Sequence, residues 1–178
     1  SSALLLDTYP SATGAYSLRK LRTAYAGSCI KVRRSSDNAT QDIGFLASGY
    51  LDTASMKTFV STGTGYIDTW YDQSGNPYDL TQSTQANQPV IIESGGTVYR
   101  QSGQVAIKFT AASSQWMSNS SLAASSAADA YLMQVFKSNA VNVGYAPVAM
   151  ASNALTYQHG STANKMNAYA GNIYAEAA

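Results

Sequence analysis

The apolar residues of this chain change their spacing near Gly65, and that change constrains the fold more than any other feature. Before Gly65, two segments space their apolar residues as helices do. After it, apolar and polar residues alternate in short runs, which are separated by turn clusters of Gly, Ser and Asn. Many short runs of this kind at regular spacing are typical of all-β sandwiches. We therefore expect an all-β fold, a two-sheet antiparallel β-sandwich or jelly roll, with one or two short helices near the N-terminus.

The two helix signals differ in strength. Residues 13–26 show a mixed helical spacing that stops at Gly27, and glycine commonly follows a helix C-terminus. Residues 52–60 give the clearer signal, because Asp52 can cap the helix start and the apolar side chains share one face. The expected strands are 29–34, 41–45, 66–71, 89–93, 104–109, 130–137, 146–151 and 165–169.

The chain shows no internal repeat and no linker, so we expect a single domain over residues 1–178, shortened or completed by other chains. Residues 166–174 are expected to form a terminal strand with no return strand after it. The unpaired backbone groups of such an edge are normally covered. We therefore expect a neighbouring subunit, in a homo-oligomer or a multi-chain assembly, to add a strand there.

Charge and cysteine content exclude several classes of site. The net charge is +1, which gives nucleic acid no strong overall attraction, and no apolar run approaches the ~20 residues of a membrane span. Cys29 is the only cysteine and His159 the only histidine, so the chain can form neither an internal disulfide nor a zinc site of Cys and His ligands. We expect no metal and no cofactor, and we interpret Cys29 as a small buried apolar residue.

Six of the 11 basic residues lie within the first 34 positions. They are Arg19, Lys20, Arg22, Lys31, Arg33 and Arg34. Such a cluster can bind a polyanion, such as nucleic acid or an anionic glycan. The alternative, which the small net charge favours, is that these residues pair with Asp side chains of the folded domain.

Aromatic and polar residues between Trp70 and Asn76 are the best candidates for a ligand-binding site. Aromatic rings can stack on sugar faces while neighbouring polar groups bind hydroxyls. The candidate residues are Trp70, Tyr71, Asp72, Gln73, Asn76 and Trp116. Strand alternation places Trp70 and Tyr71 on opposite faces, so Trp70 is alternatively a core residue. Asp72 is alternatively a cap for the backbone amides of the following turn.

The spacing of the acidic residues identifies no catalytic group. A glycosidase needs two carboxyl groups that face each other across the sugar. Asp68, Asp72 and Asp79 are the best clustered in the sequence, but sequence spacing does not give the distance between carboxylates in a sandwich. The sequence also lacks the Gly-x-Ser-x-Gly motif of a nucleophilic serine.

Five stretches of the first half of the chain form a recognisable series. They are Ala15–Arg19, Val32–Asn38, Asp42–Phe45, Trp70–Asn76 and Asp79–Gln82, with Tyr71–Asn76 the most specific. In order and spacing they resemble the catalytic domain of arabinofuranosidase B, and more closely its relatives in bacteriophage tail and virion proteins. The resemblance implies a concanavalin A-like sandwich. In those glycosidases the nucleophilic Glu and the acid/base Asp lie in the second half, past the region of clear likeness. After Glu93, the only acidic residues of this chain are Asp129 and Glu176.

The resemblance, without a matching carboxylate motif, predicts a non-enzymatic bacteriophage virion module of a tail, fibre or capsid decoration that also adheres to glycans. Its partners would be other virion subunits and a cell-surface glycan, and its location the virion or the extracellular space. Hydrolysis of arabinofuranosides is expected to be absent. Two alternatives stay open: an arabinofuranosidase-like glycoside hydrolase or its degenerate remnant, and a free extracellular lectin.

Overall fold

The computed structural model describes residues 3–122, 134–135 and 137, and the backbone of residues 148–149, 155–159, 166–170 and 173–177. The chain divides into two compact units, Ser1–Ser120 and Ser121–Ala178, and each is described by itself. The single domain expected over residues 1–178 stays a prediction.

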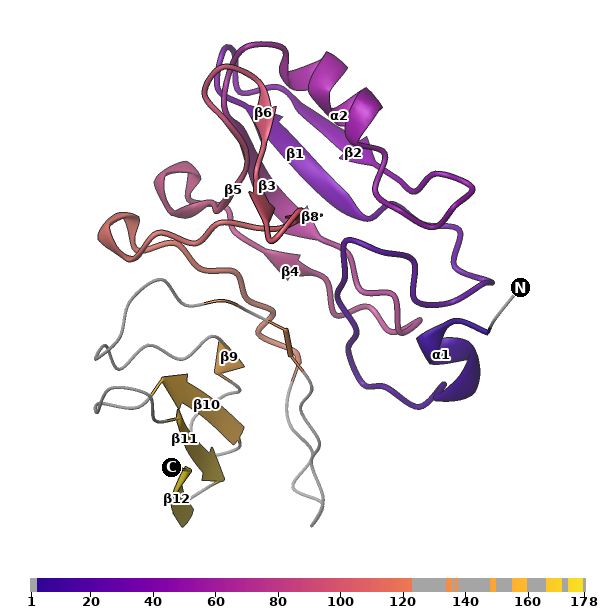
Figure 1. Cartoon of the computed structure of the whole chain (residues 1–178), viewed down its shortest axis with the longest axis vertical. Helices are drawn as coiled ribbons and strands as arrows, with labels where there is room; N and C mark the ends of the chain where they lie inside the picture. The colour runs from indigo at the N-terminus through magenta and orange to yellow at the C-terminus, as the bar shows by residue number, and fades with distance from the viewer. Residues whose placement is uncertain are drawn as a thin grey trace. The chain divides into compact units, whose positions relative to one another are not determined.

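The first unit is built on a six-stranded antiparallel sheet, which Figure 1 shows beside helix α2. Its strands are β1 (Ile30–Arg34), β2 (Thr40–Ile43), β3 (Gly65–Trp70), β4 (Leu80–Thr81), β5 (Val90–Glu93) and β6 (Thr97–Val98), while β7 (Arg100–Gln101) and β8 (Gln104–Val105) form a separate hairpin. The order in the sheet is β2-β1-β3-β5-β6, with β4 beside β3. The first four predicted strands are confirmed. Residues 104–109 form only β8 and an isolated bridge between Val90 and Lys108.

Alternating side chains of β1 and β3 supply the core of this unit. Val32 and Ile67 are opposite each other in the two strands, and both are fully buried. Tyr66 precedes Ile67 and therefore lies on the other face of the sheet. Cys29 is also fully buried, and burial raises the pKa of its thiol to about 12. The interpretation of Cys29 as a small buried residue is confirmed.

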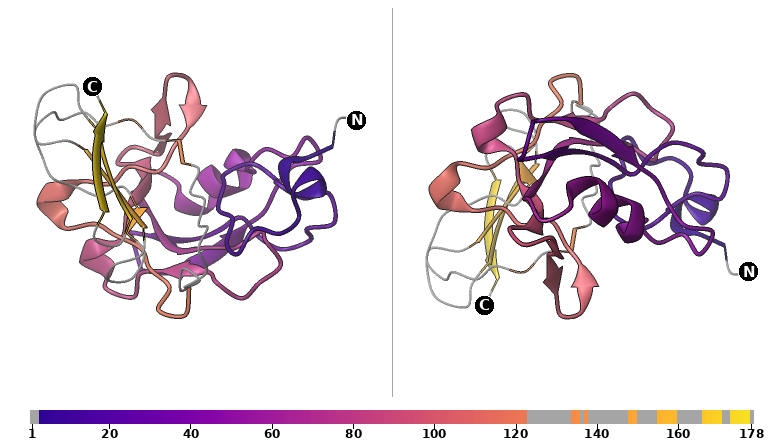
Figure 2. Two further views of the ribbon diagram at one scale, coloured as in Figure 1. Left: turned by 90° about the horizontal axis from the view of Figure 1, so that it is seen from below. Right: turned by 90° about the horizontal axis from the view of Figure 1, so that it is seen from above.

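Helix α2 (Thr53–Val60) packs against one face of this sheet, as both views of Figure 2 show. Asp52 caps the helix by accepting a hydrogen bond from the backbone N–H of Ser55 at 3.0 Å, so the predicted helix and its cap are confirmed. Gly65 lies inside β3, where a Cβ would come within 3.0 Å of a Val60 methyl group. Glycine therefore permits the close approach of helix and strand. The other helical segments of the described residues are α1 (Leu5–Thr8), η1 (Gln85–Asn87) and η2 (Ala111–Ser113), the last two being 3-10 turns.

The helix predicted over residues 13–26 is wrong. This segment is irregular, and its only pairing is an isolated bridge between Arg19 and Tyr50. The backbone N–H of Leu21 donates at 2.8 Å to the side-chain oxygen of Gln73, a residue far away in the sequence. Backbone groups that are bonded to another part of the chain are not available for the hydrogen bonds of a helix. Long-range bonds therefore override the local helical spacing.

The second unit contains a four-stranded antiparallel sheet in the order β12-β11-β10-β9. Its strands are β9 (Val148–Ala149), β10 (Leu155–His159), β11 (Met166–Ala170) and β12 (Ile173–Ala177). The prediction of one terminal strand over 166–174 is wrong, because β12 returns antiparallel to β11. The strand predicted at 130–137 falls mostly outside the described residues.

The predicted fold class is confirmed. Antiparallel sheets dominate both units, and the described helices are short and lie mainly in the first half of the chain. None of the helices in the described ranges has the length and apolar character that crossing a membrane requires.

Candidate functional site

Buried polar side chains fasten the Tyr71–Asn76 loop, which follows β3, to the N-terminal segment. Asp72 is only 5% exposed, and its Oδ1 accepts hydrogen bonds from the backbone N–H groups of Ala15 and Ser74, both at 2.8 Å. Its Oδ2 accepts a bond from the hydroxyl of Ser74 at 2.8 Å. The interpretation of Asp72 as a cap for the amides of the turn is confirmed.

Gln73 has no exposed surface and binds three backbone groups of the N-terminal segment. Its Oε1 accepts a hydrogen bond from the N–H of Leu21 at 2.8 Å. Its Nε2 donates to the carbonyl oxygens of Ser17, at 2.9 Å, and Arg19, at 3.1 Å. The described bonds of Gln73 and of Asp72 are thus internal to the fold, and a ligand contact by either residue stays a prediction.

Trp70 and Tyr71 have different surroundings. Trp70 packs against the core, and its ring centre lies 5.9 Å from that of Tyr16. The buried Nε1 of Trp70 has no hydrogen-bond partner among the described residues. The hydroxyl of Tyr71 donates to Asp42 at 2.7 Å, and burial together with this bond raises the pKa of Tyr71. Trp70 is thus partly buried and packs against the edge of the core, on the opposite face of β3 from the buried Ile67.

Asn76 and Trp116 are the exposed members of the predicted set. Asn76 borders a cavity of about 750 Å³ between the loop and the N-terminal segment, and its Nδ2 donates to the carbonyl of Thr13 at 3.0 Å. Trp116 is 49% exposed, and its backbone is bonded to Asn87 and to the side chain of Gln82. The structure therefore anchors Trp116 to a different part of the unit from the loop.

Every carboxylate of the described residues takes part in an internal hydrogen bond or ion pair. Asp68 accepts a bond from Gln88 Nε2 at 3.2 Å, and Asp79 accepts one from the N–H of Asp72 at 2.8 Å. The other pairs are Asp7 with Thr23, Asp37 with Arg34, Asp42 with Tyr71, Asp52 with Ser55, and Glu93 with Lys108. No group of three or more His, Cys, Asp or Glu side chains in the described ranges could hold a metal ion.

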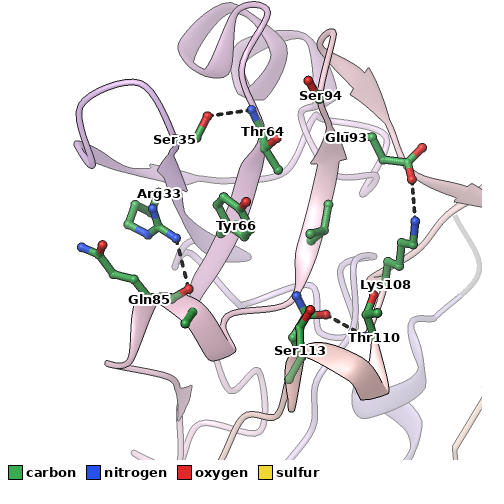
Figure 3. Close-up of a pocket in the computed structure, with 13 residues that line it drawn as sticks. Arg33, Ser35, Thr64, Tyr66, Gln85, Glu93, Ser94, Lys108, Thr110 and Ser113 are labelled. Carbon is green, nitrogen blue, oxygen red and sulfur yellow. Dashed lines mark hydrogen bonds and ion pairs between the residues drawn. The ribbon is translucent and has the colours of Figure 1, made fainter.

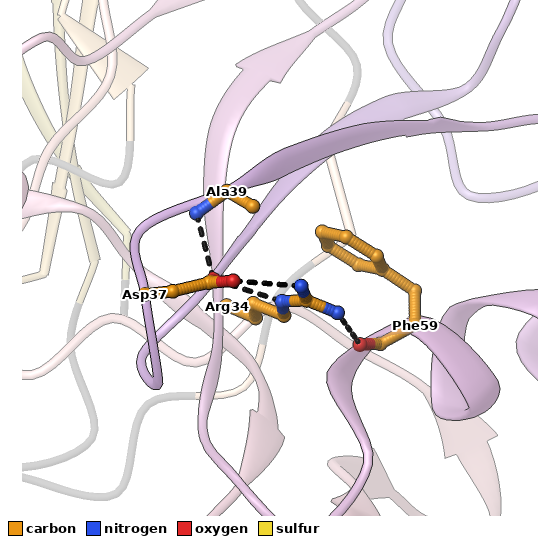
Figure 4. Close-up of polar contacts among 4 residues, drawn as sticks. All are labelled: Arg34, Asp37, Ala39 and Phe59. Carbon is orange, nitrogen blue, oxygen red and sulfur yellow. Dashed lines mark hydrogen bonds and ion pairs between the residues drawn. The ribbon is translucent and has the colours of Figure 1, made fainter.

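The basic residues of the N-terminal cluster have different partners. Arg34 binds Asp37 through Nε at 2.8 Å and through a terminal nitrogen at 2.7 Å, and it also donates to the carbonyl of Phe59 (Figure 4). Arg19 instead lies over the ring of Tyr50, 4.3 Å from its centre. Among the described residues, only Arg34 of this cluster forms an ion pair, so the predicted pairing with Asp side chains is confirmed for that residue alone.

A polar pocket of about 540 Å³ lies on the face of the sheet opposite α2 (Figure 3). Arg33 and Tyr66 line it from opposed positions in β1 and β3, and the guanidinium of Arg33 lies over the Tyr66 ring, 4.5 Å from its centre. Glu93 and Lys108 line another side and form an ion pair at 2.8 Å. Ser113 completes the lining from η2. We refer to this cavity as the Arg33 pocket.

Sequence reasoning missed the Arg33 pocket. In the sequence Arg33 is only one member of the basic cluster, and the other lining residues come from segments that are far apart. One signal was present: a basic residue directly after the buried Val32 lies on the second face of the strand. Nothing in the sequence indicated which residues would lie beside it.

Comparison with known proteins relates the chain to one family of glycoside hydrolases. The family model described as alpha-L-arabinofuranosidase B, catalytic, matches residues 7–138, well over half of the chain. The probable alpha-L-arabinofuranosidase B of Aspergillus flavus is 42% identical over 66 residues, which are 36% of this chain and 13% of that protein. The alpha-L-arabinofuranosidase of Hypocrea jecorina is 42% identical over 65 residues, again 36% of this chain and 13% of that protein. The matched stretch is thus a small part of these relatives.

Two solved structures were also matched. A GH54 α-L-arabinofuranosidase soaked with a cyclic sulfate inhibitor is 29% identical, with 50% of this chain and 22% of that chain covered and a TM-score of 0.46. An arabinofuranosidase complexed with arabinofuranosyl-alpha-1,2-xylobiose is 30% identical, with 52% of this chain and 20% of that chain covered and a TM-score of 0.42.

Proposed function

Since this chain belongs to the family of alpha-L-arabinofuranosidase B catalytic domains, we propose that it forms part of a glycoside hydrolase that acts on α-L-arabinofuranosides. The observation that carries the proposal is the family match over residues 7–138. The most specific stretch of the sequence, Tyr71–Asn76, lies within that match and folds into the fastened loop described above.

The family match overturns the prediction of a non-enzymatic bacteriophage virion module. The matched relatives named above are fungal arabinofuranosidases, and none of them is a virion protein. The matching stretches in the first half of the chain, and not a carboxylate motif, carry the relationship to the family. The virion location is withdrawn with that prediction. We propose an extracellular location instead, because polymers that carry arabinofuranosyl groups are too large to enter a cell unaided.

The described carboxylates hold the fold together, and this bears on which groups would carry out hydrolysis. Glycoside hydrolysis needs one carboxyl group as acid and a second as nucleophile or base. Each described carboxylate already accepts an internal hydrogen bond or forms an ion pair, as Asp72 and Asp52 illustrate. We therefore propose that the reacting carboxylates are supplied outside the described side chains. The acidic residues of the chain that meet this condition are Asp129 and Glu176.

The test is hydrolysis of 4-nitrophenyl α-L-arabinofuranoside by the full chain, followed through release of 4-nitrophenol. We expect turnover of this compound and none of 4-nitrophenyl β-D-xylopyranoside. Asp129→Asn and Glu176→Gln should each lower kcat at least about a hundredfold, as loss of an acid or base does. Asp42→Asn, which changes an exposed carboxylate, is the matched control.

Failure to hydrolyse the arabinofuranoside would overturn the proposed function. Turnover that survives both Asp129→Asn and Glu176→Gln would keep the activity but overturn the assignment of these two carboxylates.

A further inference from the structure

The Arg33 pocket contains a buried guanidinium whose hydrogen-bonding capacity is only partly used. Arg33 is 6% exposed and makes three hydrogen bonds, to the side-chain oxygens of Gln88 and Asn38 and to the backbone carbonyl of Gln85. The three bonds are 2.6, 2.7 and 3.3 Å long. All three acceptors are neutral amide oxygens. Because a guanidinium has about five N–H donors, two of them have no partner among the described residues.

The charge of Arg33 contacts the ring of Tyr66 and, among the described residues, no carboxylate. Within the described part of the chain, no carboxylate forms an ion pair with it. Gln88 lies between Arg33 and the carboxylate of Asp68. Its side-chain oxygen accepts a bond from Arg33, and its Nε2 donates to Asp68 at 3.2 Å. Burial of a cation without a contacting anion costs free energy, and burial accordingly lowers the pKa of Arg33. An anion in the pocket would supply the missing contact.

A second cation lines the same pocket. The ammonium group of Lys108 binds Glu93 at 2.8 Å, which uses one of its donors. Among the charged lining residues, Arg33 and Lys108 are positive and only Glu93 is negative. The pocket is therefore suited to a ligand with a negative charge.

The remaining polar groups suit hydroxyls. The side-chain hydroxyls of Thr64, Ser94, Thr110 and Ser113 line the pocket and have no hydrogen-bond partner among the described residues. The same holds for the side-chain amide of Gln85. Tyr66 and Val90 add ring and methyl surface, as Figure 3 shows for Tyr66. The volume of about 540 Å³ lies in the range of small-molecule sites.

We propose that the Arg33 pocket binds a carboxylate-bearing sugar, that is, a uronic acid residue of a glycan. The carboxylate would lie against the free N–H groups of Arg33, whose planar fork matches a carboxylate, and within reach of Lys108. The sugar hydroxyls would bind the unpartnered side chains of the lining. That the ligand is a sugar rests on the proposed function; that it is anionic rests on Arg33 and Lys108.

The first experiment measures binding of trigalacturonate to the full chain by titration calorimetry. Fully methyl-esterified trigalacturonate is the matched probe without charge, and inorganic sulfate is the probe of charge without a sugar. We expect trigalacturonate to bind roughly tenfold more tightly than either, because only it offers both a carboxylate and hydroxyls. Equal affinity for the methyl ester, equal affinity for sulfate, or no binding of trigalacturonate would each overturn the proposal.

The second experiment tests the place of binding. Lys108→Gln should weaken trigalacturonate binding roughly tenfold and reduce its salt dependence. Lys57 is an exposed lysine of α2, on the other face of the sheet. Lys57→Gln is therefore the matched control and should change neither the affinity for trigalacturonate nor its salt dependence. Equal effects of the two variants would overturn the assignment to this pocket. Turnover of 4-nitrophenyl α-L-arabinofuranoside, measured in parallel on the unmodified chain, reports on the proposed function independently of this binding.

Discussion

The Tyr71–Asn76 loop and the Arg33 pocket are both rich in polar side chains, but they use them in opposite ways. In the loop, the side chains of Asp72 and Gln73 are buried and bonded to backbone groups of the N-terminal segment. In the pocket, Arg33 has unused donors and the hydroxyl of Ser113 has no partner among the described residues. Compared with Asp72 and Gln73, the described polar groups of the pocket have donors and acceptors that remain available to a ligand.

The most distinctive stretch of the sequence and the polar groups that remain available to a ligand are therefore in different places. The loop is the most distinctive stretch of the sequence, and its distinctive residues stabilise the fold. The pocket is assembled from ordinary residues of β1, β3, β5 and the segment around Lys108. The described bonds of the loop motif fasten the fold, and a role of the motif in ligand binding stays a prediction.

The largest effect is expected for Asp72→Ala. The substitution leaves the N–H groups of Ala15 and Ser74 without their acceptor in a buried position, which should lower the free energy of unfolding by about 2–3 kcal/mol. Urea denaturation followed by tryptophan fluorescence measures the change. Asp42→Ala removes the same charge from an exposed position and should cost within about 1 kcal/mol. Equal losses in the two variants would remove the distinction between buried and exposed carboxylates.

A smaller effect is expected from Asp37, an exposed carboxylate. Hydrogen bonds from Arg34, and then from the N–H of Ala39, hold the pKa of Asp37 well below its usual value. An unfolded Asp titrates near pH ~3.9, so the stabilisation is present above that pH and is lost as the pH falls toward the lower pKa of the folded state. Asp37→Asn should flatten this part of the stability–pH profile, measured by urea denaturation from pH ~6 downward. If the free energy of unfolding of Asp37→Asn depends on pH as steeply as that of the unmodified chain, the ion pair between Arg34 and Asp37 contributes nothing to stability.

The smallest effect is expected for Ser113→Ala in the pocket. The hydroxyl of Ser113 has no described partner and the residue is exposed, so the free energy of unfolding should change by less than about 0.5 kcal/mol. The urea midpoint is the measurement. A loss as large as that of Asp72→Ala would mean that the pocket, like the loop, is built for stability, and the contrast between the two regions would disappear.

Local pattern determined much of the first unit. Alternation in 29–34 and 66–71 predicted β1 and β3. The cap at Asp52 was also readable, because its partner is three residues away. The role of Asp72 as a cap was predicted from the turn that follows it. In both caps, the interaction that decides the structure is close in the sequence.

Tertiary structure alone decided the rest. Residues 13–26 have a helical spacing, but Gln73 and Asp72 bind their backbone from more than 50 positions away and keep the segment irregular. The Arg33 pocket likewise exists only because pairing of the strands brings Arg33 beside Tyr66 and places both near Lys108. Periodicity reports which face of an element is apolar. It does not report which distant polar group will meet that face, because this depends on the register and the packing of the whole sheet.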